Sequence, residues 1–294
     1  FEKIIFDLFV SGNFSYKTFK GEELLNLKNT KLSGELIEEK IVISFDFQHY
    51  SSIFSFGTTF NLKERFKPDI FLKIDHINVK DLLKIWPQNL SSSVYYWMNE
   101  NSRGLINNFF TKIHFTSSEE TFHLDKLDGK FDFKDVEIRY MESMPSIKMI
   151  NGNAKINSDS IEFFVENGLS EKLKIVDGYI NLFDLNTDIE KADIDLRIIS
   201  ENNNVVNYLD NSPINKKNFI KLRKISGDTD IKLYLDFPLL LDLQAEEIKY
   251  NAEVKIFNAQ INNLIYNLSL DKLKIDLKVG NEIVEYTGNA MIEN

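Results

Sequence analysis

The chain has 294 residues, of which 35 are basic and 45 acidic, so its formal net charge is −10 at pH 7. This negative charge argues against nucleic acid or an anionic membrane surface as the main electrostatic partner. The sequence contains no cysteine, which excludes disulfide frameworks and cysteine-based metal sites. No apolar run approaches the ~20 residues of a membrane-spanning helix. Because the chain begins with Phe1, we expect a section of a longer protein, with any membrane anchor outside it.

Apolar and polar side chains alternate through the first 78 residues, which predicts half-buried β-strands. Ile41, Ile43 and Phe45 show this step of two strictly. We expect Ser11 and Gly12 to end the first strand. The predicted strands in this part span residues 3–10, 24–36, 40–47, 54–62 and 69–77.

Residues 79–103 replace this pattern with helical spacing. After Asn78, a suitable N-cap, apolar residues recur at i, i+3, i+4 and i+7, and a second apolar stripe precedes Gly104. We interpret these residues as a helical pair that covers one end or edge of the sheet. A lid over a ligand channel is the alternative interpretation. The candidate lid residues are Leu82, Leu83, Trp86, Val94, Trp97 and Met98.

The strictest alternation lies in residues 126–199, where glycines punctuate short segments such as KLDGKF and IVDGYI. Across the chain, six segments share an apolar residue, a small polar residue and then glycine. This pattern is typical of a β-bulge or of the start of a strand, and it indicates one strand-and-bend unit used repeatedly. The six glycines are Gly34, Gly129, Gly152, Gly178, Gly227 and Gly288.

An asparagine-rich insert at residues 201–223 separates the central strands from the last ones. Its apolar residues predict two short helices, and strands resume at Gly227. We therefore expect one continuous segment over residues 1–294. It comprises sheet at 1–78, a helical insert at 79–103, central sheet at 104–200, a second helical insert at 201–223 and sheet at 224–294. The residues that predict the two short helices are Val205, Val206 and Leu209, then Phe219, Ile220 and Leu222.

The pattern predicts a mainly β fold with about fifteen antiparallel strands and a few short helices. A flat open sheet of this size usually curls or splits. One face of the sheet is apolar, so it needs a cover. The candidate covers are a second sheet, closure into a barrel, the short helices, or a ligand that is not protein.

The sequence lacks the motifs of nucleotide-binding loops, zinc proteases and serine hydrolases. Its acidic residues fall on the polar phase of the strands, where solvated faces explain them better than general acid–base catalysis. Asp128 and Asp177 lack the spacing of a calcium site. We therefore expect no enzyme, no metal and no cofactor. The histidines, which have no neighbour at ligand spacing, are His49, His76, His114 and His123.

Two groups of residues carry a resemblance to a known family. The first is a helical passage with Trp86-Pro87, Trp97-Met98, Asn101 and Gly104. The second is a strand pair in which Leu127, Gly129, Phe131 and Phe133 precede Val136, Ile138 and Tyr140. Together they resemble the AsmA-like proteins of Gram-negative bacteria, most closely the YhdP-type branch. The likeness spans most of residues 81–294 and is weak over the first eighty. At Met144-Pro145-Ser146 the family often has paired prolines.

The resemblance implies a long curved antiparallel sheet that forms an open U-shaped groove, with a repeating β architecture. It further implies a periplasmic section of an inner-membrane-anchored protein that carries phospholipid or another acyl lipid toward the outer membrane. Outer-membrane components are implied as further partners, and nucleic acid is not.

On this basis we expect an acyl chain to lie along the apolar strand faces. Closed core packing is the competing explanation for the same residues. The candidate groove residues are Phe131, Phe133, Ile138, Tyr140, Ile161, Phe163, Ile194, Leu196, Leu233, Leu235, Leu273 and Ile275.

Two other classes of function remain open. A non-enzymatic scaffold could assemble outer-membrane proteins by adding their strands to the edge of its sheet. A closed sandwich that binds polysaccharide would need exposed aromatic platforms, and the 2 tryptophans both fall in predicted helices.

Overall fold

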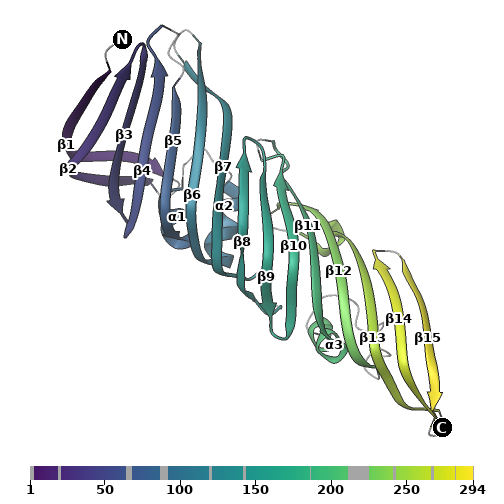
Figure 1. The fold of residues 1–294 in the computed structure, drawn as a ribbon. Helices are drawn as coiled ribbons and strands as arrows, with labels where there is room; N and C mark the ends of the chain where they lie inside the picture. The colour runs from purple at the N-terminus through teal and green to yellow at the C-terminus, as the bar shows by residue number, and fades with distance from the viewer. Residues whose placement is uncertain are drawn as a thin grey trace. The chain divides into compact units, whose positions relative to one another are not determined.

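The computed structural model describes residues 3–18, 21–63, 68–86, 92–118, 121–141, 144–185, 187–210, 225–240, 243–265, 268–281 and 283–293. Fifteen strands form one antiparallel sheet that is not closed, and each strand pairs with its neighbours in the sequence (Figure 1). The predicted fold class is therefore confirmed. The strands are β1 (Ile4–Thr18), β2 (Gly21–Ile37), β3 (Lys40–His49), β4 (Ser52–Asn61), β5 (Asp69–Asn78), β6 (Ser102–Ser118), β7 (Thr121–Ile138), β8 (Ile147–Asn157), β9 (Ile161–Ser170), β10 (Leu173–Phe183), β11 (Lys191–Glu201), β12 (Ser226–Pro238), β13 (Lys249–Ile265), β14 (Leu268–Gly280) and β15 (Val284–Glu293).

The chain divides into two compact units. The first comprises Phe1–Lys134 and Asn153–Ile161, and the second comprises Asp135–Gly152 and Glu162–Asn294. Three α-helices and one 3₁₀-helix complete the described elements: α1 (Val79–Lys84), α2 (Ser92–Asn101), α3 (Asn202–Asp210) and η3 (Ala245–Glu247).

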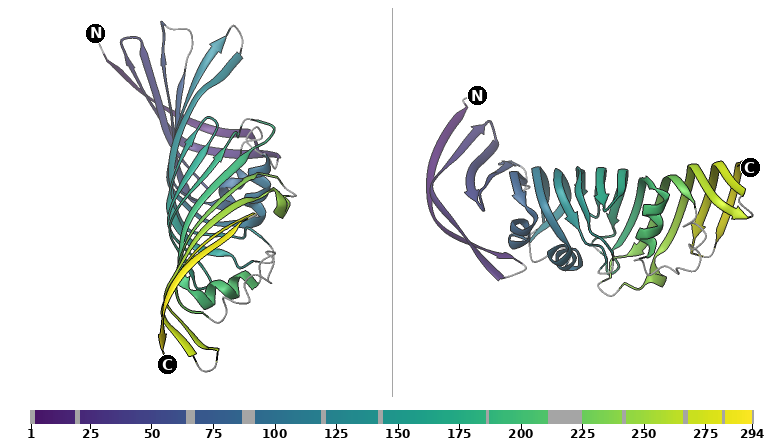
Figure 2. Two further views of the ribbon diagram at one scale, coloured as in Figure 1. Left: turned by 90° about the vertical axis from the view of Figure 1, so that its right-hand side faces the viewer. Right: turned by 90° about the horizontal axis from the view of Figure 1, so that it is seen from below.

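In the first unit, α1 and α2 pack on one face of the sheet (Figure 2). Their apolar side chains close a core with residues from β4, β5 and β6. Leu83 of α1 and Ile77 of β5 are 2% and 1% exposed. Asn78 occupies the N-cap position of α1, but its side chain makes no capping hydrogen bond. Burial of the apolar stripe, rather than the cap, therefore holds α1 on the sheet.

The buried side of α2 differs from the predicted stripe. Val94 is buried as expected, and Met98 packs against the core. Tyr95 is 3% exposed and belongs to the core, whereas Trp97 is 41% exposed. Tyr95 and Trp97 are two residues apart and so lie on opposite sides of this helix of 10 residues, and sequence spacing did not show which of them faces the sheet.

In the second unit, α3 packs against β11 and β12. Val205 and Val206 are its buried apolar residues, and Asn202 at its start is also buried. The first helix predicted in residues 201–223 is thus present. The second, predicted from Phe219, Ile220 and Leu222, lies outside the described residues.

The strands contain bulges rather than the breaks that some glycines suggested. β1 continues past Ser11 to Thr18, and its register with β2 shifts between Val10 and Gly12. The expectation that Ser11 and Gly12 end this strand was therefore wrong. The register also shifts beside Asn258 of β13 and Lys272 of β14, and both of these residues have a positive φ of 51°. Bulges of this kind bend a strand while its pairing continues.

Gly227 of β12 occupies a position that only glycine fits. Its φ is +124°, and a Cβ atom there would lie 2.7 Å from the carbonyl oxygen of Phe257 and 2.8 Å from Cα of Ala259. These are backbone and short side-chain atoms that cannot rotate away. Glycine at this position therefore allows β13 to approach β12 closely at the bulge.

We expect Gly227→Ala to lower the free energy of unfolding by about 1–3 kcal/mol, because it adds both backbone strain and a steric clash. Urea denaturation followed by circular dichroism would measure the loss. Gly280→Ala is the matched control, because the added Cβ there meets only the carbonyl oxygen of Tyr250 at 3.5 Å. Equal losses in the two variants would contradict the assigned role of Gly227.

Candidate functional site: a partly covered apolar face

The register of the second unit aligns apolar side chains in rows across its strands. Ile194 of β11 lies opposite Leu235 of β12, and Leu196 lies opposite Leu233. Leu233 in turn lies opposite Ala252 of β13. Directly opposed residues in an antiparallel pair project from the same face of the sheet. The predicted groove residues of β11 and β12 are therefore brought together on one face.

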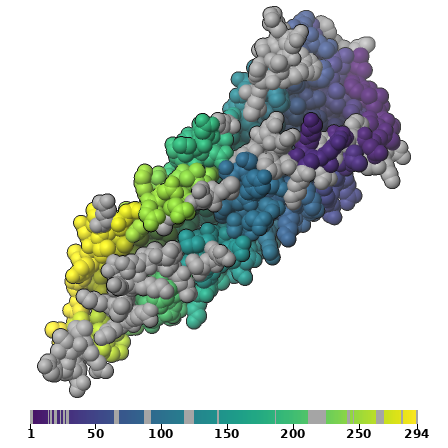
Figure 3. Space-filling model, turned by 180° about the vertical axis from the view of Figure 1, so that it is seen from behind, coloured from purple at the N-terminus to yellow at the C-terminus, as the bar shows by residue number. Residues whose placement is uncertain are grey.

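This apolar face is only partly buried. Ile194, Leu196, Leu233 and Leu235 all keep intermediate exposure, although they lie in the middle of long strands. A second sheet packed on this face would exclude water from such positions. Figure 3 shows the surface of the second unit hollowed beside the light-green and yellow strands. Among the described residues, no second layer seals the face.

The opposite face of the same strands is charged and exposed. Arg197 donates hydrogen bonds from Nε and Nη2 to Oδ1 and Oδ2 of Asp230, over 3.1 and 2.8 Å. Lys249 and Asp236 form another cross-strand ion pair, at 3.4 Å. Water solvates this face, so the two sides of the sheet differ in the ligands that they can take.

The hydrogen bonds from Arg197 hold the pKa of the Asp230 carboxyl below its ordinary value of 3.8. A lowered pKa in the folded state stabilises the fold above the unfolded value, and this contribution is lost as the pH falls through the folded pKa. We expect Asp230→Asn to lower the urea midpoint slightly at pH 7, as is typical of exposed ion pairs. The difference from the parent chain should shrink below pH 3.8. A difference that grows on acidification would contradict this account.

The predicted groove residues of the first unit form an aromatic cluster. Phe131 stacks on Phe109 of β6 at 6.2 Å between ring centroids, and Phe133 lies 6.4 Å from Phe131. Phe133 is 7% exposed, so it belongs to the closed core, while Phe131 and Ile161 are partly exposed.

The remaining candidates lie in the second unit. Ile275 is partly exposed, whereas Leu273 is 6% exposed and packs in a core with Ile256 and Ala259. Ile138 and Phe163 are partly exposed. Tyr140 is 40% exposed, and its hydroxyl shares a 2.6 Å hydrogen bond with that of Tyr208 in α3.

Sequence reasoning missed several residues of the same apolar face. They follow the same step of two, so the alternation of apolar residues could have identified them. Only the register of each strand pair showed that they belong to this apolar face. In the second unit these residues are Ile180, Leu182, Phe237, Val254, Leu277 and Val279.

The candidate lid residues serve mainly as core in the first unit. Leu83 and Val94 are buried, and Leu82, Trp86 and Met98 pack partly buried against the same cluster. This packing fits a fixed cover over one part of the sheet.

The described residues contain no group of acidic or histidine side chains that could hold a metal ion. None of the described helices is long and apolar enough to cross a membrane.

A family model described as "YhdP protein" matches residues 28–289. The chain belongs to the YhdP family. Membership of the YhdP family suggests AsmA-like lipid transport, and the matched range includes residues 28–80, where the sequence resemblance was weak. No curated protein and no solved structure matches the chain.

Proposed function

We propose that this chain carries phospholipid acyl chains along its apolar face, as the periplasmic section of a protein anchored in the inner membrane. In this proposal the chain is not an enzyme, and it acts between the inner and outer membranes. The observation that carries it is the row of opposed, partly exposed leucine and isoleucine side chains on β11 and β12. Membership of the YhdP family supports the same function.

The energetics of lipid transfer explain why an open apolar face would serve this purpose. Moving an acyl chain from a bilayer into water costs ~0.8 kcal/mol per CH₂, or more than ~10 kcal/mol for a chain of ~16 carbons. A continuous apolar lining removes most of this cost without any specific polar contact. The cross-strand row of Ile194, Leu235 and Tyr250, beside that of Leu196, Leu233 and Ala252, provides such a lining.

Site-specific photo-crosslinking tests this proposal directly. A photoreactive phenylalanine at Leu235 would project from the apolar face, and one at Tyr234 would project from the charged face one residue away. In cells fed labelled phospholipid precursors, we expect label on the Leu235 variant and little on the Tyr234 variant. Native mass spectrometry of the purified chain should show bound phospholipid. Equal labelling of both faces, or a chain free of lipid, would overturn the proposal.

A further inference from the structure

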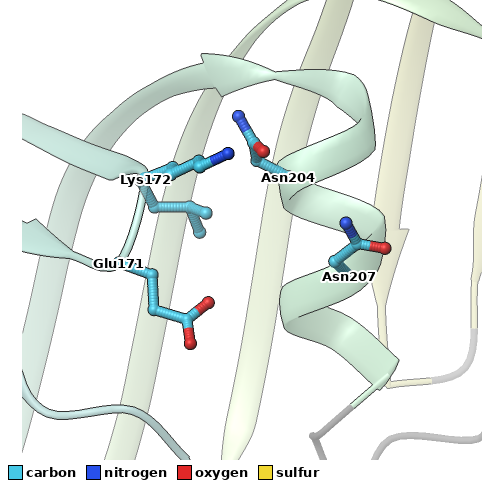
Figure 4. A pocket seen from close by; sticks show the side chains of 5 residues that line it. Glu171, Lys172, Asn204 and Asn207 are labelled. Atoms are coloured by element: carbon cyan, nitrogen blue, oxygen red, sulfur yellow. The ribbon is translucent and has the colours of Figure 1, made fainter.

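A polar cleft of about 370 Å³ lies between the β9–β10 turn and α3 (Figure 4). Glu171 and Lys172 line it from the turn, and Asn204 and Asn207 line it from the helix. Leu173, at the start of β10, completes the lining and is 6% exposed. The cleft therefore combines a carboxylate, an ammonium group and two carboxamides with one apolar wall.

Hydrogen bonds hold the two walls of this cleft together. Ser170, which is 4% exposed and precedes the turn, lies 3.2 Å from the Tyr208 hydroxyl of α3. That hydroxyl also lies 2.6 Å from the hydroxyl of Tyr140. At the other end of α3, the buried amide of Asn202 donates to the carbonyl oxygen of Ile225 over 2.7 Å. These contacts hold both ends of α3, and the contact at Tyr208 joins the helix to the strand before the turn.

The polar side chains of the cleft are available to a ligand. Glu171 and Lys172 are neighbours in the turn, yet they form no ion pair with each other, and neither bonds through its side chain to another described residue. The same holds for the carboxamides of Asn204 and Asn207 within the described part of the chain. Lys172 and the two carboxamides can donate to a phosphate, and Glu171 can accept from an ammonium group.

The apolar wall of the cleft leads onto the face described above. Leu173 and Ile175 are two residues apart on β10, so they share a face, and Ile175 lies opposite Ile198 of β11. Ile198 lies opposite Ile231 of β12, which adjoins the Leu233 row. Leu173, Ile175 and Ile231 are 6%, 6% and 9% exposed, so neighbouring side chains cover most of this stretch. The surface open to an apolar chain begins at Ile198 and Leu233, which keep intermediate exposure.

We propose that this cleft binds the headgroup of a zwitterionic phospholipid, one that carries a phosphate and an ammonium group. This inference rests on the proposed lipid function and adds a headgroup preference to it. Lys172 pairs with the phosphate, Glu171 pairs with the ammonium group, and Asn204 and Asn207 complete the phosphate contacts. An anionic lipid has no ammonium group, so it leaves the Glu171 carboxylate unpaired beside the negative charge of the lipid.

The test compares two short-chain phospholipids, one with a phosphoethanolamine and one with a phosphoglycerol headgroup, both below their micelle concentration. Binding to the purified chain is measured by calorimetric titration, with free glycerophosphoethanolamine as a third ligand. We expect the chain to bind the zwitterionic lipid about tenfold more tightly than the anionic one, because only the zwitterionic lipid makes the charge-assisted contact with Glu171. The double variant Glu171→Gln, Lys172→Gln should lose this preference. The control pair Glu166→Gln, Lys174→Gln removes the same charges at exposed positions outside the cleft and should keep it.

The outcomes separate this inference from the proposed function. Equal binding of the two lipids, or an unchanged preference in the cleft variant, would overturn the headgroup site and leave acyl-chain binding intact. Binding of free glycerophosphoethanolamine as tight as that of the lipid would support the headgroup site and contradict the proposed acyl-chain binding, because the apolar residues would then contribute nothing. If neither lipid binds, the proposed function fails and this inference fails with it.

Discussion

Leu233→Glu should abolish the binding of acyl lipid to the second unit. Leu233 lies in the middle of the open apolar face, opposite Leu196 and Ala252. An acyl chain laid over Glu at this position would take the carboxylate out of water, which costs several kcal/mol. Each 1.4 kcal/mol is a factor of ten in affinity, so we expect a loss of at least about a hundredfold. Native mass spectrometry and calorimetric titration would both measure it.

Ile199→Glu is the matched control for this change. It adds the same charge to a neighbouring strand, but residue 199 projects from the charged face, where it lies opposite Lys174 and Asp230. Both variants should fold, because Leu233 is partly exposed and Ile199 is exposed. Circular dichroism would check this point. Lipid binding that survives Leu233→Glu, or that fails equally in both variants, would show that the chain does not bind lipid on this face.

Leu83→Ala should destabilise the first unit by about 2–5 kcal/mol. Leu83 is 2% exposed and packs among Phe54, Ile74 and Tyr95, so truncation leaves a cavity that the surrounding strands cannot easily fill. Both of the chain's tryptophans, Trp86 and Trp97, lie in this unit. Tryptophan fluorescence during urea unfolding therefore reports the first unit without a signal from the second.

A Trp97→Phe background would sharpen the measurement, because Trp86 packs against the core and Trp97 is exposed. Lys80→Ala in the same helix is the control, and at this exposed position it should change stability by less than about 0.5 kcal/mol. A similar small effect for Leu83→Ala would mean that α1 is only loosely attached to the sheet.

The sequence predicted the class and the strand number of this fold because each strand repeats one simple pattern. Alternation marks a strand wherever one face is apolar, and polar turns such as Gly280-Asn281 separate the strands. The pattern was less informative where glycine lies inside a strand. At Gly12 a bulge and a turn have the same sequence signature, and only the pairing of β1 with β2 distinguished them.

The candidate site was harder to predict than the fold. Alternation showed which residues of the same strand share a face with Ile194 or with Leu233. It did not show which residues lie opposite them on the adjacent strands, because each bulge shifts the register of later residues. The hydrogen bond between Tyr140 and Tyr208 joins residues 68 apart in the sequence. No local pattern encodes such a contact. The cleft at α3 was therefore visible only in the structure.

Because each strand pairs with its neighbours in the sequence, the number of strands in this sheet can change during evolution. Since each described strand pairs only with the strands before and after it in the chain, duplication or deletion of one hairpin leaves every other pairing in place. Adjacent strands are ~4.8 Å apart, so one such event changes the reach of the sheet by about 10 Å. A change in the number of hairpins therefore alters the length of the sheet and keeps the order of the remaining strands.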